Sequence, residues 1–267
     1  MNAHIAASEK DEVLVERWDG GRITAIALNR PAKRNAFSPA LAKAFRAQLE
    51  QAIAEDSNLL LVRSANPGMF CSGFDISFIG TELHGPGEAE MLESFAKLQA
   101  ARKVTAALAD GAVYGGGTEL FLSADLRLCT PNATFRITPA LLGVVYPYQG
   151  LARFISILGI TAATELVLTA RLVDAAEAMR IGLVTRVVPD EAAGMEYCRQ
   201  VASLAPLSQQ AMKAIMKLAA DRMAPLEATE AQWRAIEALA AAADESDDQQ
   251  EGKRAFLEKR APKFRGR

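Results

Sequence analysis

Short, uninterrupted apolar runs that alternate with amphipathic segments constrain the fold of this chain more than any other feature of its sequence. The run Leu59–Val62 contains no polar residue, which is typical of a strand buried on both faces of a parallel sheet. The preceding segment is amphipathic as far as Asp56, with Ser38 as a candidate N-cap and Pro39 in the first turn. Helix and strand thus alternate, and this pattern predicts an α/β fold.

The same alternation continues along the chain and predicts the other elements. Strands are expected at 13–18, 23–28, 59–62, 104–108 and 126–129. Helices are expected at 38–56, in a segment ending near 102, at 118–123, 191–205, 208–222 and 226–243, and in a last short segment before 262. Asp19–Gly21 is a hairpin signal between the first two strands, and the polar stretch up to Gly87 is expected to form a flap.

The repeated unit of strand, loop and helix predicts a wound, spiral architecture rather than independent modules. Beyond Pro189 the sequence becomes rich in alanine and helical in pattern. We therefore expect two parts, a spiral core at residues 1–205 and a C-terminal helical region at 206–267, with the boundary near Ala205.

Charge and cysteine content exclude several classes of function. The 267-residue chain has 30 Lys and Arg against 32 Asp and Glu, so it has no global positive field for nucleic acid or an anionic bilayer. No uncharged run approaches the roughly 20 residues that span a bilayer. The three scattered cysteines fit a reducing compartment, and we expect a cytoplasmic protein. Because His4 and His84 are the only histidines, a Ser-His-Asp triad or a His-ligated metal site is not expected.

Two glycine-bearing loops, 68–76 and 111–119, carry the chemistry that the sequence suggests. Each follows a parallel-type strand, and ligand sites in open α/β sheets gather beyond the carboxyl ends of strands, so we expect the loops to converge. The run Gly115–Gly117 lets the backbone approach a ligand, and the helix that begins there turns free N–H groups toward it. Neither a Walker lysine nor GxGxxG spacing is present, so a developing oxyanion fits better than a bound phosphate.

Four motifs stand in a specific order and spacing: Asn29–Pro31 with Asn35–Ala36, Phe70–Ile76, Gly111–Leu120 and Ala124–Asp125. Together they resemble the crotonase (enoyl-CoA hydratase/isomerase) superfamily. The resemblance implies a spiral of ββα units, a C-terminal helical trimerisation region, and homotrimers or dimers of trimers. It implies a coenzyme A thioester as substrate, with no permanently bound cofactor and no metal. It also implies that the backbone N–H groups of Phe74 and Gly116 grip the thioester oxygen as it becomes an enolate.

Glu119 stands where the resemblance places the first acid/base residue of the family, one turn into the helix after the glycines. A solvated or helix-capping glutamate is the alternative. Hydratases of this family use a second glutamate directly after a proline, and that position here is Ala140. Because two groups orient and activate the water that is added across a double bond, the loss of one carboxylate argues against ordinary hydratase or isomerase activity.

Thr138–Pro139 is followed by Leu142–Val144 and then by Tyr146. This pattern, and the ending from Ser246 onward, resemble the methylmalonyl-CoA decarboxylase branch of the superfamily. Cleavage of a carboxylate next to a thioester yields the enolate directly and requires no base. The resemblance implies that Tyr146 orients the departing carboxylate, and a structural ring packed by its neighbours is the alternative.

The catalytic residues expected from the resemblance are Phe74, Gly116, Glu119 and Tyr146. Those expected to bind substrate or coenzyme are Lys33, Arg34, Ala36, Ser72, Gly73, Asp75, Ile76, Gly115, Thr138, Pro139, Ala140, Phe256 and Lys259. Lys33 and Arg34 offer positive charge for the coenzyme phosphates. The basic tail after Glu251 is expected over a neighbouring subunit's coenzyme, with Phe256 and Lys259 facing inward; a solvated charged face is the alternative.

We expect a lyase that decarboxylates a methylmalonyl-CoA-type thioester. An enoyl-CoA hydratase or isomerase with Glu119 as its only carboxylate is the first alternative, and a non-catalytic acyl-CoA-binding scaffold is the second. RNA binding is disfavoured by the isoelectric point of about 5.9. A protease of a related spiral fold is disfavoured because neither histidine is placed near a candidate nucleophile.

Overall fold

The structure is a computed structural model of the chain, and it describes residues 4–5, 11–223, 230, 234, 238, 241 and 245–263. Mutual contacts divide the chain into two compact units. The first consists of Met1–Arg136 and Leu172–Ile215, and the second of Ile137–Arg171 and Met216–Arg267. The division expected between residues 205 and 206 stays a prediction.

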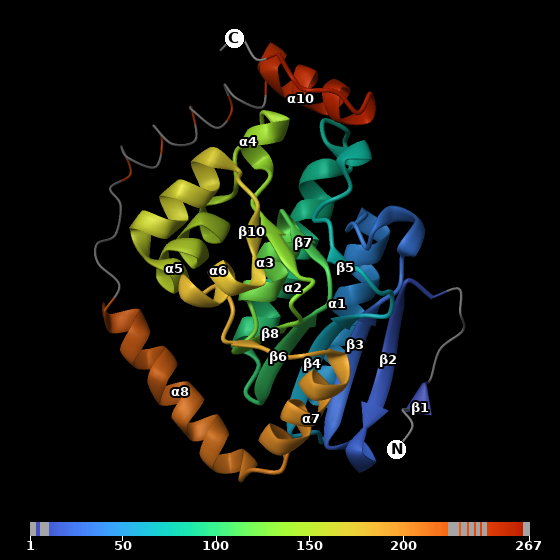
Figure 1. Cartoon of the computed structure of the whole chain (residues 1–267), viewed down its shortest axis with the longest axis vertical. Coiled ribbons are helices and arrows are strands. Elements are labelled where there is room, and N and C mark those ends of the chain that lie inside the picture. The colour runs from blue at the N-terminus through green and yellow to red at the C-terminus, as the bar shows by residue number, and fades with distance from the viewer. Residues whose placement is uncertain are drawn as a thin grey trace. The chain divides into compact units, whose positions relative to one another are not determined.

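The main sheet of the first unit is mostly parallel (Figure 1). Its order is β1 (His4–Ile5), β2 (Val13–Trp18), β3 (Ile23–Leu28), β4 (Leu59–Ser64), β6 (Val104–Ala109), β8 (Leu126–Cys129) and β11 (Arg186–Val187). β2 and β3 form the antiparallel hairpin predicted around Asp19–Gly21, with Trp18 opposite Ile23. From β3 onward all neighbouring strands are parallel, so the expected α/β class is confirmed.

A second, smaller sheet lies in the same unit, and three of its strands each come directly after a strand of the main sheet in the chain. Its order is β10 (Val173–Asp174), β9 (Thr134–Arg136), β7 (Ala112–Tyr114) and β5 (Met69–Cys71). The chain passes from β4 to β5, from β6 to β7 and from β8 to β9, and these three short strands pair in parallel. Helix α2 (His84–Ala100) follows β5, and α3 (Gly116–Leu122) follows β7. This is the spiral of ββα units that the resemblance implied.

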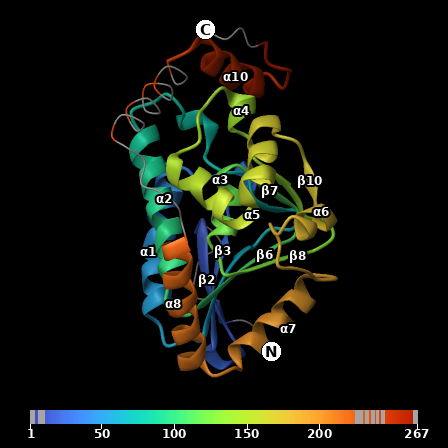
Figure 2. The ribbon, with the colours of Figure 1, turned by 90° about the vertical axis from the view of Figure 1, so that its left-hand side faces the viewer.

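Helix α1 (Pro39–Ala54) begins where the sequence predicts it. The Ser38 Oγ accepts a hydrogen bond from the Leu41 N–H at 3.1 Å, and Pro39 occupies the first helical position, where no N–H is needed. Phe45 and Leu49 lie on the buried face of the helix. Figure 2 shows α1 and α2 side by side on one side of the main sheet. The helix therefore has a buried face, as the amphipathic pattern of this segment predicts.

Helix α2 begins earlier than expected, at His84. Pro86 lies in its first turn, where a missing N–H removes no helical hydrogen bond. Gly87 approaches α1 so closely that a Cβ there would lie 2.8 Å from the Pro39 Cγ. The predicted flap is therefore wrong for residues 84–87, which form a helical turn packed against α1.

Strand β4, at the centre of the main sheet, is buried on both faces along Leu59–Val62. Leu59 and Leu61 of β4 pack in a hydrophobic cluster with Cys198 of α7 (Glu191–Ala202), which lies on the side of the sheet opposite α1 (Figure 2). Leu60 and Val62, which alternate with them along β4, face the other way and are also fully inaccessible to solvent. This burial accounts for the uninterrupted apolar run in the sequence. The other helices that begin in this unit are α6 (Ala175–Arg180) and α8 (Pro206–Met223).

The second unit contains α4 (Pro139–Leu142), α5 (Tyr148–Thr169) and α10 (Asp247–Leu257). A Cβ at Gly252 of α10 would collide with the Leu142 carbonyl, and one at Gly143 would lie 2.7 Å from the Asp248 oxygen. Two glycines thus allow α10 to pack directly on α4. The last short helix is confirmed as α10, whereas the helix expected at 226–243 falls almost entirely outside the described residues.

Helix α5 is the one helix in the described part of the chain that is long and apolar enough to cross a membrane by length and composition alone. Its 22 residues include Arg153 and Glu165, and 22% of its most apolar window is buried. Gly159, with φ 73° and ψ 159°, breaks the helical backbone near its middle. Each arm is therefore only about half of the roughly 20 residues that a helix needs to span a bilayer.

We predict that glycine is required more strictly at position 111 than at position 20. Both have positive φ, 106° and 65°, but only a Cβ at Gly111 would collide with the backbone of Gly68. Gly20→Ala should lower the free energy of unfolding by about 1–2 kcal/mol, the cost of a left-handed backbone. Gly111→Ala should cost at least about 1–3 kcal/mol more because its neighbours must move. Urea unfolding followed by circular dichroism measures both, and equal losses would contradict the packing argument.

Candidate active site

The two glycine-bearing loops meet at the carboxyl ends of β5 and β7, which are parallel neighbours. A Cβ at Gly73, whose φ is 96°, would lie 2.8 Å from the Gly116 nitrogen and 3.0 Å from the Tyr114 oxygen. A Cβ at Gly117 would collide with the Cys71 carbonyl. The backbones of the two loops are thus in direct contact, as expected, and this contact leaves no room for side chains at positions 73 and 117.

The Phe74 backbone is fixed by a parallel bridge to Phe37. The Phe37 N–H donates to the Gly73 oxygen at 2.7 Å, and the Asp75 N–H donates to the Phe37 oxygen at 2.9 Å. The Phe37 ring is itself anchored edge-on against Phe45, with ring centroids 5.4 Å apart. Because the peptide groups of an extended segment alternate in direction, the Phe74 N–H faces away from this bridge.

The amides of Phe74 and Gly116 form a pair of backbone donors on adjoining loops. Gly116 is the first residue of α3, where an N–H has no acceptor inside the helix. Within the part of the chain that the structure describes, neither amide donates a hydrogen bond. Two such donors on rigid backbone can stabilise an oxygen on which negative charge develops.

Asn35 holds the segment before α1 against both sheets. Its backbone is left-handed, with φ 54°, a conformation that asparagine tolerates. The buried side-chain amide donates to Ser64 Oγ at 2.8 Å and to the Phe70 oxygen at 2.9 Å, and its oxygen accepts from the Arg30 N–H at 2.8 Å. The backbone oxygen of Arg34, the residue before Asn35, accepts a hydrogen bond from the Ser72 N–H. This segment and the loop after β5 are therefore tied together.

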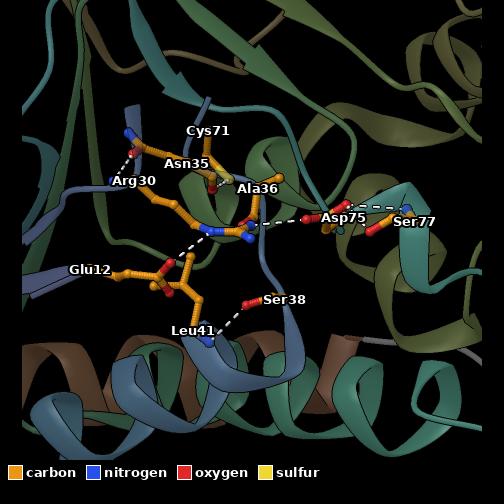
Figure 3. Close-up of polar contacts among 9 residues, drawn as sticks. All are labelled: Glu12, Arg30, Asn35, Ala36, Ser38, Leu41, Cys71, Asp75 and Ser77. Atoms are coloured by element: carbon orange, nitrogen blue, oxygen red, sulfur yellow. Dashed lines mark hydrogen bonds and ion pairs between the residues drawn. The ribbon is translucent and has the colours of Figure 1, made fainter. Parts of the chain in front are cut away.

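Asp75 is an internal partner of Arg30 rather than an exposed carboxylate (Figure 3). One of its oxygens accepts from the Ser77 N–H at 3.1 Å and Ser77 Oγ at 2.7 Å, and the other accepts from Arg30 Nη1 at 3.0 Å. Burial alone would raise the pKa of the Asp75 carboxyl. The hydrogen bonds from Ser77 and Arg30 outweigh burial, so the pKa lies below its ordinary value. Asp75 is thus ionised and supports the loop.

Glu119 lies in the first turn of α3 and is 1% exposed, which excludes a solvated surface glutamate. A buried carboxylate is costly, and such residues gather at functional sites. Its role as an acid/base residue stays a prediction. Met91 of α2 lies beside the same loop, because a Cβ at Gly116 would be 3.2 Å from the Met91 Cε.

Cys71 has a structural role in the same loop. Its Sγ donates to the Asn35 oxygen at 3.1 Å and accepts from the Gly73 N–H at 3.4 Å. Burial raises the pKa of the Cys71 thiol to about 12, which makes it a poor nucleophile at neutral pH. Burial also raises the pKa values of Cys129 and Cys198 to about 12.

The other predicted residues of the first unit differ in exposure. Lys33 and Arg34 are exposed, Ala36 and Gly115 are buried, and Ser72 and Ile76 are half-buried. The Phe74 ring contacts His84, with centroids 5.5 Å apart. The sequence reasoning gave His84 no role, and no spacing signal links positions 74 and 84. Arg30 belongs to the motif Asn29–Pro31, but no local signal in the sequence links it to Asp75, which lies 45 positions further on.

The second unit carries the remaining predicted residues. Thr138 precedes α4, Pro139 is its first residue, and Ala140 is exposed. The Tyr146 ring packs edge-on against Phe154, with centroids 5.5 Å apart. The roles expected for these residues stay predictions.

The basic tail is partly neutralised within its own unit. Phe256 is 56% exposed, and Lys259 is exposed at the end of α10. Arg260 pairs with Glu251 at 2.9 Å and also with Glu258, and Arg254 pairs with Glu251. For these two arginines the alternative of a solvated charged face fits. The last two basic residues lie outside the described residues.

Among the described residues, no group of three or more His, Cys, Asp or Glu side chains is placed so that it could hold a metal ion.

Comparisons with known proteins agree with the fold. The family model described as "Enoyl-CoA hydratase/isomerase" matches residues 19–267. A 2,3-dehydroadipyl-CoA hydratase of Escherichia coli is 33% identical over 261 residues, which cover 96% of this chain and 99% of that protein.

Two solved structures extend the comparison. A methylmalonyl-CoA decarboxylase in complex with 2-nitronate-propionyl-CoA has a TM-score of 0.86 at 25% identity, covering 96% of this chain and 99% of that chain. An enoyl-CoA hydratase/isomerase from Pseudoalteromonas atlantica has a TM-score of 0.78 at 26% identity, covering 96% and 100%. The Escherichia coli hydratase is thus similar to this chain by sequence identity, and the methylmalonyl-CoA decarboxylase is similar to it by backbone superposition.

Proposed function

Because the chain belongs to the enoyl-CoA hydratase/isomerase family, we propose that this acyl-CoA enzyme decarboxylates a short, branched malonyl-type thioester such as methylmalonyl-CoA. The observation that carries the proposal is the pair of amides, Phe74 and Gly116, on loops whose backbones touch. A second observation favours decarboxylation over hydration. The position of the second hydratase glutamate is occupied by Ala140.

The proposed step needs little from the protein besides the two amides. When the bond between the α-carbon and the carboxylate breaks, its electron pair stays on the α-carbon and carbon dioxide leaves. The thioester carbonyl then becomes an enolate oxygen, and the two N–H groups bind it. One donor of this kind contributes about 3–4 kcal/mol to transition-state stabilisation. A proton from solvent water finally adds to the α-carbon, which gives the decarboxylated thioester and leaves hydroxide in solution.

Four further predicted residues have roles in the proposed reaction. Tyr146 hydrogen-bonds and orients the departing carboxylate, and Ala140 brings no like charge to oppose that carboxylate. Lys33 and Arg34, both exposed, meet the phosphates of coenzyme A, which enters as part of the substrate. No permanently bound cofactor is part of this reaction. A cytoplasmic location remains part of the proposal.

The alternative is an enoyl-CoA hydratase or isomerase that uses Glu119 as its sole acid/base. The burial of the Glu119 carboxylate favours this alternative function, and the similarity to proteins named as hydratases supports it. A non-catalytic acyl-CoA-binding scaffold is the remaining alternative.

A direct assay separates the three functions. We expect release of carbon dioxide from methylmalonyl-CoA or ethylmalonyl-CoA. We expect no hydration of crotonyl-CoA, because Glu119 is the only one of the two acid/base glutamates that is present. Glu119→Gln should retain decarboxylation, whereas it should abolish hydration or isomerisation. Hydration without release of carbon dioxide would refute the proposal. Tight binding of acyl-CoA without turnover of any thioester would favour the scaffold.

Removal of one amide donor tests the mechanism. Gly116→Pro deletes the N–H at the first helical position, which proline occupies readily. We expect kcat to fall by at least about 10²–10³, because the donor is lost. KM should rise as well, because the proline Cδ takes the place of the amide hydrogen beside the bound oxygen. Gly116→Ala is the matched control, because it keeps the N–H and the tight contacts of its Cβ are with the flexible end of Met91, whereas the Gly73 Cα lies at an ordinary contact distance of 3.6 Å. Similar activities in the two variants would exclude this amide as an oxyanion donor.

We also propose a homotrimer or a dimer of trimers. Leu207, Met212 and Ile215 of α8 are 78%, 53% and 66% exposed, and apolar surface of this kind usually marks an interface. Ile215→Glu should shift the sedimentation coefficient to that of a 28.6 kDa monomer, because a buried charge opposes association. Gln200→Glu on the exposed side of α7 is the control and should leave the assembly intact. A wild-type monomer would contradict this part of the proposal.

A further inference from the structure

We propose that Arg30 is a positioning residue that joins the segment carrying Ala36 to the loop carrying the Phe74 amide. The inference rests on the proposed function, because it treats the Phe74 amide as an oxyanion donor and the segment at Ala36 as part of the coenzyme site. It adds a role that neither the motif nor the mechanism assigns to Arg30.

The Arg30 side chain bonds to both pieces at once (Figure 3). Its Nη1 donates to the Ala36 oxygen at 2.8 Å and to Asp75 Oδ2 at 3.0 Å, while Nε donates to Glu12 at 2.8 Å. The side chain is only 16% exposed. The Arg30 backbone is held as well, because its N–H and C=O both bond to Asn35. Hydrogen bonds therefore fix Arg30 both at its backbone and at its guanidinium group.

These bonds converge on the backbone that carries the donor. Ala36 and Asp75 flank, respectively, Phe37 and Phe74, the two residues of the parallel bridge. The bridge contributes two backbone hydrogen bonds, and the guanidinium adds a link between the neighbouring residues. A shift of Asp75 would carry the Phe74 N–H with it. A misplacement of about 1 Å in a catalytic group can cost about 10²-fold in rate.

Arginine is the residue type that this geometry requires. A planar guanidinium presents several donors in fixed directions, whereas a lysine ammonium is a compact point charge on a flexible chain. Arg30→Lys therefore keeps the positive charge between Glu12 and Asp75 but should not hold both acceptors in place. Burial raises the pKa of the Asp75 carboxyl, but the hydrogen bonds from Ser77 and from Arg30 outweigh burial and lower the pKa overall.

The chain offers a matched control in a second buried arginine–carboxylate pair. Arg63 and Glu16 lie 2.8 Å apart, with side chains 19% and 3% exposed, against 16% and 7% for Arg30 and Asp75. This pair joins β4 to β2. Among the described residues, the other hydrogen bonds of its two side chains are with Ser64 and Trp18, which lie outside both glycine-bearing loops. Its disruption should cost stability without moving the Phe74 amide.

The kinetic experiment compares four variants of the full-length protein. For Arg30→Lys and Asp75→Asn we expect kcat to fall by about 10–100-fold, with a smaller change in KM, because the donor is misplaced. Arg63→Lys and Glu16→Gln should lower the melting temperature while keeping kcat and KM near wild type. If Arg30→Lys and Asp75→Asn also lose only stability, the positioning role is refuted.

A second readout is independent of turnover. Protein labelled with ¹⁵N-phenylalanine has 11 such amides, and the Phe74 signal is assigned by its absence in Phe74→Leu. We expect this signal to move in Arg30→Lys and Asp75→Asn and to stay in place in Arg63→Lys and Glu16→Gln. An unmoved signal would overturn the inference. A moved signal in a protein that turns over no thioester would support the positioning role while the proposed function fails.

Discussion

The close approach of two backbones, at Gly73 and at Gly116, is the constraint on which the rest of the structure depends. It requires β5 and β7 to be adjacent and parallel, because only then do the loops that follow them leave the sheet at the same edge. It also requires residues without side chains at the point of contact. The spiral of paired strands meets the first requirement, and the glycines at positions 73 and 117 meet the second.

Backbone amides are suited to this chemistry because the fold itself fixes their direction. The Phe74 N–H is aimed by the bridge to Phe37, and the Gly116 N–H by the start of α3. Neither donor depends on a side-chain rotamer, so neither must be reorganised when charge develops on a bound oxygen. The side chains around the donors can then differ between relatives and change the reaction. One backbone arrangement thus accompanies both the hydratase/isomerase and the decarboxylase names among similar solved structures.

Much of the fold could be predicted because its signals are local. The run at 59–62, the Ser38 cap and the hairpin at Asp19–Gly21 each depend on neighbouring residues only. The short strands β5, β7 and β9 could not be predicted. Each has only three residues, which is too few to show a periodicity, and each is a strand only through its pairing. The Arg30–Asp75 pair was also missed. Its members are 45 positions apart, and only the folded sheet brings them together.

The inert thiols have a practical consequence for the study of this molecule. Cys71, Cys129 and Cys198 are all buried, and at neutral pH almost none of each is present as thiolate. A cysteine introduced on the surface would therefore be the preferred target of a maleimide dye, with no need to mutate the native three. Fluorophore pairs and spin probes could thus be attached at chosen sites while the sulfur that braces the Gly73 loop stays untouched.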